Sequence, residues 1–165
     1  MIYLIDANCF IEAKNVSNPL DVAISFWNKI KQLAVAGRIH SIDKVKGELT
    51  ALNDELSQWV KDNIPANFFL PTTGSDVLSK YSETIQWATN NGFKPNAIAD
   101  YSQSTKADAF LVAYASTDPT NIKIVTNEVS GNGSLKKIKI PDACLPQKVN
   151  CIRVMEMLRE MNETF

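Results

Sequence analysis

The hydrophobic pattern of the chain begins with IYLI at residues 2–5, a run that contains no polar position and stops at Asp6. Short apolar runs of β-branched and aromatic residues are typical of strands buried on both faces of a parallel sheet. Residues 122–126 (IKIVT) and 149–152 predict two further strands, whereas 38–42 indicates a weak strand or an extended link. The first run is therefore expected to form a central strand.

Helical periodicity dominates the segments between these strands. Asn18, Pro19 and Asp21 predict a helix start, because asparagine caps helices, proline fits the first turn and an acid favours the positive helix end. The predicted helices run from Asn18 to Gly37, from Ile42 to Leu52, from a cap at Asn53 to Pro65, from Asp76 to Asn90, from Pro95 to Tyr101, from Thr105 to Ala115 and from Val154 to Met161.

This order of elements predicts an α/β fold, a three-layer sandwich with a mostly parallel central sheet and a helix-rich middle third. The chain of 165 residues shows no repeat or linker, so we expect a single domain spanning residues 1–165. Ligands of such sheets bind beyond the carboxyl ends of the strands, where the strand order reverses. Asp6 and the residues after Thr126 follow strand ends and mark the place to look for chemistry.

Composition excludes several kinds of site. The 17 basic and 18 acidic residues nearly cancel, so any nucleic acid must bind a local basic patch. Cys9, Cys144 and Cys151 are scattered and form no Cys-x-x-Cys pair, which argues against a disulfide framework or a zinc knuckle and fits a reducing cytoplasm. No apolar run is long enough for a membrane span, and His40 is the single histidine. Carboxylates must therefore carry any metal chemistry.

Two acids border apolar segments. Asp6 follows the first strand directly, where a carboxylate in low-dielectric surroundings favours a cation, although a turn shared with Asn8 explains it equally well. Glu48 lies in the helical segment KVKGEL beside Leu49 and so borders the apolar face. Taken alone, a glutamate on a helix surface is more often simply solvated.

The other candidate acids also have structural explanations. Asp108 stands three residues after Thr105, a capping-box pattern that favours a role in starting the helix, and this role is compatible with metal binding. Asn127 and Glu128 follow a predicted strand, and Asp142 follows a proline in a turn. The functional interpretation rests on the whole set, because Mg²⁺ and Mn²⁺ prefer several carboxylate oxygens and suit phosphodiester cleavage.

The set resembles the PIN-domain nucleases. The resemblance lies in YLIDAN around Asp6, KVKGEL around Glu48, KADAFLVAYA around Asp108 and IVTNE ending at Glu128, whose order and spacing span most of the chain. The segments FIEAKN, GRIHSIDKV, FFLP, KIPDAC and MLREMNETF are also similar to an uncharacterised bacterial PIN-like family.

This resemblance implies an endoribonuclease dependent on Mg²⁺ or Mn²⁺, often the toxin of a toxin–antitoxin pair, with an antitoxin peptide lying in the acidic groove. PIN-like relatives often form homodimers. Asp6, Glu48 and Asp108 carry over as catalytic metal ligands. The commonest fourth ligand is an aspartate two residues after the threonine, where this chain has Glu128, so Glu128, Asn127 and Asp142 stay open for that place.

The expected mechanism uses one or two metal ions to activate a water and to neutralise charge on the scissile phosphate. Thr126 and Asn8 are candidates to orient this water or a carboxylate by hydrogen bonding. Lys136, Lys137 and Lys139 follow in a loop where they either steer the RNA backbone or are merely solvated.

Two other classes of function compete. A phosphoaspartyl enzyme or a receiver domain also has an aspartate after its first strand. A phosphoaspartyl enzyme would have a second aspartate at the position of Asn8, and a receiver domain would have a further acid beside Asp6. A catalytically weak RNA- or protein-binding module would keep the fold with an incomplete metal site. His40 and Cys9 are expected to have structural roles.

Overall fold

The computed structural model describes residues 1–165, and its sheet is built outward from the first strand. Strand β1 (Ile2–Ile5) pairs with β4 (Ile122–Val125), and β4 pairs with β5 (Asn150–Ile152). Both pairings are parallel. The strands predicted at 2–5, 122–126 and 149–152 are therefore confirmed, with ends that differ by no more than one residue.

A second parallel pair extends the sheet on the other side of β1. Strand β2 (Ser41–Ile42) pairs with β3 (Phe69–Leu70), and a parallel bridge joins Leu4 of β1 to His40, just before β2. The Ser41 hydroxyl also donates a hydrogen bond of 2.5 Å to the Ile5 carbonyl. The strand order is thus β3-β2-β1-β4-β5, with β1 in the middle as predicted.

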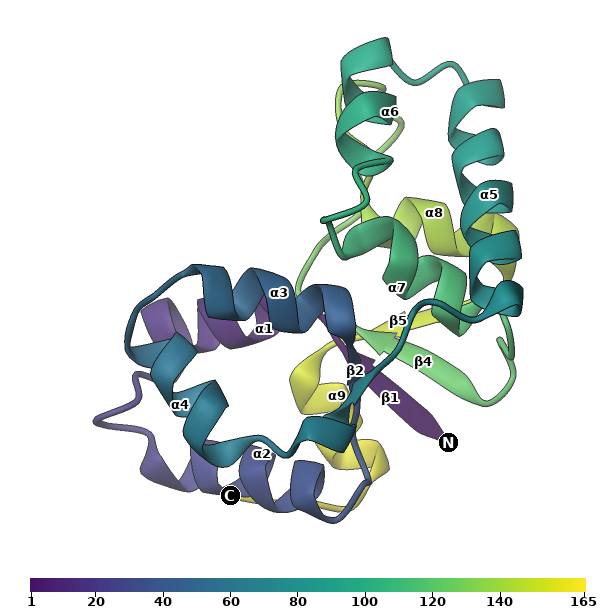
Figure 1. The fold of residues 1–165 in the computed structure, drawn as a ribbon. Helices are drawn as coiled ribbons and strands as arrows, with labels where there is room; N and C mark the ends of the chain where they lie inside the picture. The colour runs from purple at the N-terminus through teal and green to yellow at the C-terminus, as the bar shows by residue number, and fades with distance from the viewer.

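Helices connect the strands and surround the sheet (Figure 1). They are α1 (Ala7–Glu12), which continues as a π-helical turn (Ala13–Ser17), α2 (Ile24–Val35), α3 (Asp43–Ala51), α4 (Glu55–Asn63), a 3-10 turn (Ala66–Phe68), α5 (Ser75–Asn90), α6 (Pro95–Tyr101), α7 (Asp108–Ala115), α8 (Ile140–Gln147) and α9 (Val154–Glu160). None of them combines the length and the apolar character that a membrane crossing requires.

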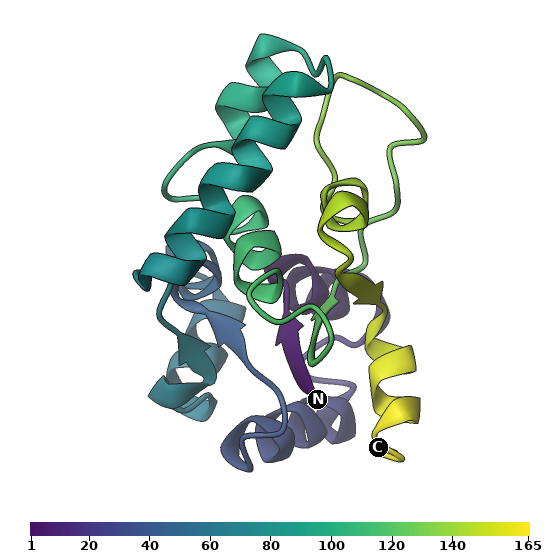
Figure 2. The ribbon, with the colours of Figure 1, turned by 90° about the vertical axis from the view of Figure 1, so that its right-hand side faces the viewer.

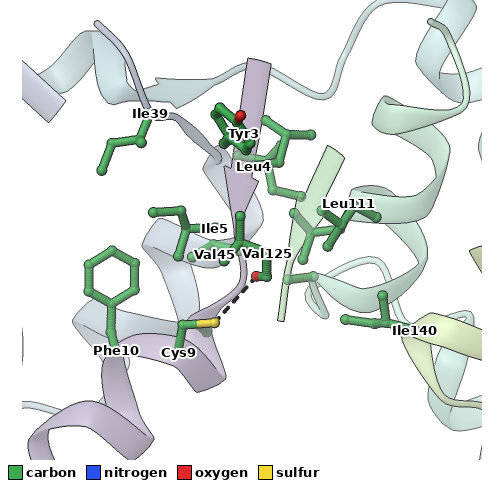
Figure 3. Packing of buried hydrophobic residues seen from close by; sticks show 14 of the residues in the cluster. Tyr3, Leu4, Ile5, Cys9, Phe10, Ile39, Val45, Leu111, Val125 and Ile140 are labelled. Carbon is green, nitrogen blue, oxygen red and sulfur yellow. Dashed lines mark hydrogen bonds between the residues drawn. The ribbon is translucent and has the colours of Figure 1, made fainter. Parts of the chain in front are cut away.

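Both faces of β1 are covered, as its unbroken apolar run predicts. Ile5 lies toward Phe10 and Ile39, whereas Leu4 points the other way, toward Leu111 of α7 (Figure 3). Successive strand residues point to opposite faces of a sheet, which explains the alternation. These side chains belong to a single cluster of 39 buried residues.

Helix α9 is fixed to the sheet through one glutamate. Tyr3 of β1 donates a hydrogen bond of 2.9 Å to Glu160, and Lys123 of β4 approaches the same carboxylate at 2.7 Å. Tyr3 and Lys123 are paired in register, so their side chains point to the same face. The predicted last helix is therefore present and covers the face of the sheet that carries these two residues.

The loop between β4 and α8 reaches far from the sheet. Figure 2 shows it running up beside the helical hairpin of α5 and α6. The backbone N–H of Lys94, which precedes α6, donates a hydrogen bond of 2.9 Å to the Leu135 carbonyl in this loop. The two segments, distant in sequence, thus hold each other in place.

The predicted helix starts need three corrections. Asn18 closes the π-helical turn instead of capping a helix, and α2 begins only at Ile24. The cap of α4 is Asp54, which accepts a hydrogen bond from the Ser57 N–H, whereas Asn53 adopts a positive φ of 51°.

The third correction concerns Thr105, which caps nothing, because α7 begins at Asp108 without a side-chain cap. The capping-box interpretation of Asp108 is therefore wrong, although Asp108 does lie in the first helical turn. Helices α1 and α8 were not predicted at all, and Asp142 lies in the first turn of α8 and not in a loop turn.

Leu4→Ala should lower the free energy of unfolding by about 2–5 kcal/mol, because it leaves a cavity at the centre of the core. Urea denaturation of the two proteins measures the difference. The control is Val35→Ala at a position 63% exposed, which should change stability by about 0.5 kcal/mol or less. Equal losses in both variants would contradict a core centred on β1.

Candidate functional site

Asp6 is held where β1 and β4 end side by side. Its backbone N–H donates to the Val125 carbonyl at 2.9 Å, which continues the pairing of the two strands. Its side chain accepts a hydrogen bond of 2.9 Å from the hydroxyl of Thr126, the residue that follows β4. Asp6 is only 3% exposed. The chain therefore buries a carboxylate at the strand ends and fixes its direction.

The Thr126 hydroxyl is itself oriented by its neighbours. It accepts hydrogen bonds from the Asn8 side-chain amide at 3.2 Å and from the Glu128 backbone N–H at 3.1 Å. The Asn8 carbonyl oxygen accepts one from the Asn127 backbone N–H at 3.2 Å. With its acceptor positions used, the hydroxyl is left to donate its proton to Asp6. Asn8 and Thr126 thus orient a carboxylate, and Asn127 contributes its backbone.

Glu48 reaches from α3 to the start of α7. Its Oε1 accepts a hydrogen bond of 2.9 Å from the backbone N–H of Ala107, the residue before Asp108. The first N–H groups of a helix lack partners within the helix, so an acceptor there is stabilising. This contact places Glu48 beside the start of α7, although 59 positions separate Glu48 from Ala107 in the sequence.

Glu128 is turned toward the start of α8. One carboxylate oxygen lies 2.6 Å from the Lys139 ammonium, and the other accepts a hydrogen bond of 2.9 Å from the Ile140 backbone N–H. This side chain therefore anchors the first turn of α8 and neutralises one of the three loop lysines. Lys139 is consequently paired with an acid of the site.

The acids share one electrostatic environment. The pKa of Asp6 is raised to about 8, first by burial and then by the negative charge of Asp108, while the Thr126 hydrogen bond acts in the opposite direction. The charges of Glu128 and Glu48 raise it as well. The other three predicted acids therefore all act on the most buried one.

Asp108 behaves in the same way. Its pKa is raised to about 6, first by burial and then by the charges of Glu128 and Glu48. Lys137 and Lys106 lower it, so both lysines lie near enough to act on this acid. Burial likewise raises the pKa of Glu48. The pKa of three of the four acids is therefore raised, and burial is the largest cause in each case.

The donor chemistry of the site fits a hard divalent cation, since every candidate ligand is a carboxylate oxygen. No group of three or more acidic, histidine or cysteine side chains converges closely enough to coordinate an ion as the side chains lie. Glu48 and Glu128 make hydrogen bonds to backbone N–H groups instead. Both would have to rotate toward Asp6 and Asp108 to complete a coordination shell.

The remaining candidates are placed differently. Asp142 accepts hydrogen bonds from the Ser130 hydroxyl and the Gly131 N–H, so it organises the loop before α8. Lys136 is exposed in that loop. His40 Nε2 lies 3.1 Å from the Gly37 carbonyl. The contacts of Asp142 and His40 are thus with neighbouring loop residues.

Sequence reasoning missed two features of this region. Lys106, two residues before Asp108, acts on the acidic cluster, and only its position in the motif KADAF hints at this. The thiols of Cys144 on α8 and Cys151 on β5 lie 3.1 Å apart, so these two cysteines are not scattered in space. Cys9 is a buried core residue whose pKa is raised by burial.

Comparison with known proteins gives one match. A family model described as "Domain of unknown function (DUF4411)" matches residues 3–165, which include every candidate site residue. No curated protein and no solved structure matches the chain.

The metal-free protein should lose stability as the pH rises from the ordinary aspartate pKa of 3.8 toward about 8, where Asp6 ionises. In this interval an unfolded aspartate has lost its proton while folded Asp6 keeps it. The unfolded state then binds fewer protons, so the free energy of unfolding falls with rising pH. Urea denaturation across this range in EDTA measures the fall. Asp6→Asn cannot titrate and should show a shallower slope; identical slopes would contradict the burial of a titrating Asp6.

Proposed function

Because the chain belongs to the family described as "Domain of unknown function (DUF4411)", whose description names no activity, we propose a function from the site itself. We propose that the protein is an endoribonuclease that depends on Mg²⁺ or Mn²⁺ and hydrolyses RNA phosphodiester bonds with water. The observation that carries the proposal is the electrostatic cluster of Asp6, Glu48, Asp108 and Glu128 at the ends of β1 and β4.

The burial of this cluster supports a cation as its partner. Burying a carboxylate without a counter-charge is costly, and neither Asp6 nor Asp108 forms a salt bridge. The cost is visible in the raised pKa values of both acids, about 8 and about 6. A divalent cation held by both would remove it, and it would supply an acidified water and neutralise charge on the phosphate.

The four acids would differ in how they hold the metal ion. Asp6, with Thr126 behind it, offers one rigid carboxylate, and Asp108 offers a second from the start of α7. Glu48 and Glu128 would complete the ligand set by leaving their backbone donors. We favour Glu128 over Asp142 as the fourth acid, since Glu128 acts on both Asp6 and Asp108, whereas Asp142 is engaged by Ser130 and Gly131.

The wider features of the proposal rest on the resemblance to PIN-domain nucleases and on the layers of helices that cover the sheet. The coverage of the sheet by α7 and by α9 supports a three-layer sandwich of the PIN kind. A toxin role, an antitoxin partner, a homodimer and a cytoplasmic setting rest on the resemblance and the cysteine usage alone. Lys137, which lies near Asp108, is the loop lysine best placed to contact the RNA backbone.

One observation favours a second function. Glu48 and Glu128 are both satisfied by backbone N–H groups, so the fold does not need an ion to hold them. A PIN-fold module that binds RNA or protein with little catalysis would keep this arrangement. Metal binding and cleavage therefore have to be measured separately.

Mn²⁺ should raise the melting temperature of the protein, because an ion that binds only the folded state stabilises it. At about one hundred times the dissociation constant the gain is about 2.7 kcal/mol. Differential scanning fluorimetry with and without Mn²⁺ measures the increment. Asp6→Asn should abolish most of it, while Asp62→Asn, an exposed acid on α4, should keep it. A full increment in Asp6→Asn would remove Asp6 from the ligand set.

Asp108→Asn should reduce metal-dependent RNA cleavage by several orders of magnitude while keeping the fold, because asparagine preserves the shape but removes the charge. The assay is cleavage of a mixed single-stranded RNA pool in Mn²⁺, with circular dichroism to confirm folding. Equal cleavage by folded wild type and variant would show that Asp108 is no ligand. Absence of cleavage by the wild type with any divalent metal would favour the binding module.

A further inference from the structure

Two thiols outside the acidic cluster lie in direct contact. Cys144 belongs to α8 and Cys151 to β5, and the Cys151 thiol donates a hydrogen bond of 3.1 Å to the Cys144 sulfur. Neither thiol has a part in the proposed hydrolysis. The third cysteine, Cys9, lies on α1, and its thiol donates to the Val125 carbonyl at 3.3 Å. The fold therefore pairs two of the three thiols and keeps the third one apart.

The backbone holds both members of this pair in place. Helix α8 ends in a Schellman arrangement, in which the N–H of Val149 donates to the Cys144 carbonyl at 3.1 Å and Lys148 adopts a positive φ of 57°. This turn leads the chain back beside the last turn of the helix. The register of β5, in which Cys151 pairs with Ile124 of β4, then fixes the second thiol. The contact between the two thiols thus follows from the helix end and the strand pairing together.

The two thiols differ in their access to solvent. Cys144 is only 2% exposed, and the contact with Cys151 and burial raise its pKa, so it stays protonated at neutral pH. Cys151 is half-buried and lines a pocket of about 280 Å³ that also contains Glu128 and Pro141. Reaction of a cysteine requires access as well as a sulfur atom. A small oxidant that enters the pocket therefore meets Cys151 first.

We propose that Cys144 and Cys151 form a redox-active pair that a hydroperoxide converts reversibly into a disulfide. Cys151 is the thiol that reacts with the peroxide, and Cys144 is the thiol that resolves the intermediate. This inference goes beyond the proposed ribonuclease function and does not depend on it. In a compartment that keeps thiols reduced, such a disulfide is transient and responds to the presence of an oxidant.

The reaction has two steps. The sulfur of deprotonated Cys151 attacks one oxygen of hydrogen peroxide, the O–O bond breaks, and the departing hydroxide takes up the proton that Cys151 lost. This gives a sulfenic acid and one water. The Cys144 sulfur then attacks the sulfur of the sulfenic acid, the S–S bond forms, the S–O bond breaks, and the hydroxide leaves with the Cys144 proton as a second water. The two thiols thereby lose two electrons, and the peroxide is reduced to water.

Mass spectrometry of the protein before and after treatment with hydrogen peroxide tests the proposal. In denaturant, iodoacetamide should modify all three cysteines of the reduced protein but only Cys9 after oxidation, and dithiothreitol should restore the other two. Trypsin cleaves after Lys148, so the disulfide should hold the peptides 140–148 and 149–153 together. A disulfide that involves Cys9 or joins two molecules would overturn the proposal. Three free thiols after a treatment that oxidises N-acetylcysteine completely would overturn it as well.

Substitutions separate the roles of the two thiols. Cys144→Ser should stop the reaction at the sulfenic acid of Cys151, which dimedone traps, because the resolving sulfur is missing. Cys151→Ser should lose this reaction, since the remaining thiols are buried. The matched control is Cys9→Ala, which should still form the disulfide, and circular dichroism confirms that each variant is folded. Equal trapping of Cys144 in folded Cys151→Ser would overturn the order of reaction assigned to the pair.

Discussion

The site depends on the hydrogen bond between the Thr126 hydroxyl and the Asp6 carboxylate. It joins the residues that follow two neighbouring parallel strands, so the sheet register itself sets the direction of the most buried acid. Asn8 and the backbone of Glu128 fix the hydroxyl from the other side. A carboxylate held in this direction is exposed to the negative charges of its neighbours, and these charges raise its pKa.

The parts of the fold that sequence predicts are those set by local patterns. The apolar run before Asp6 predicted a central strand buried on both faces, and the structure confirms it, since β1 is hydrogen-bonded to neighbours on both sides. Helices with a regular apolar stripe, such as α5, were also found within one residue. In both cases the residues that determine the element lie within the element.

The predictions that were wrong concern features that depend on contacts between segments distant in the sequence. Thr105 and Asp108 have the spacing of a capping box, but Glu48 from α3 supplies the acceptor at the start of α7. Likewise Glu128 provides an acceptor for α8, a helix whose sequence holds Pro146 in its interior and has no clear apolar stripe. The charges of the four acids act on one another, whereas the direction of the Glu48 and Glu128 side chains follows from partners that lie far away in the sequence.

The contact between Glu48 and Ala107 also constrains which substitutions are acceptable at position 48. The same side chain joins two helices in the folded chain and contributes charge to the cluster. Replacing it with alanine would remove both properties at once, whereas glutamine would keep a hydrogen-bond acceptor and lose only the charge. A relative that keeps the contact between α3 and α7 but not the charge is therefore expected to carry glutamine at this position.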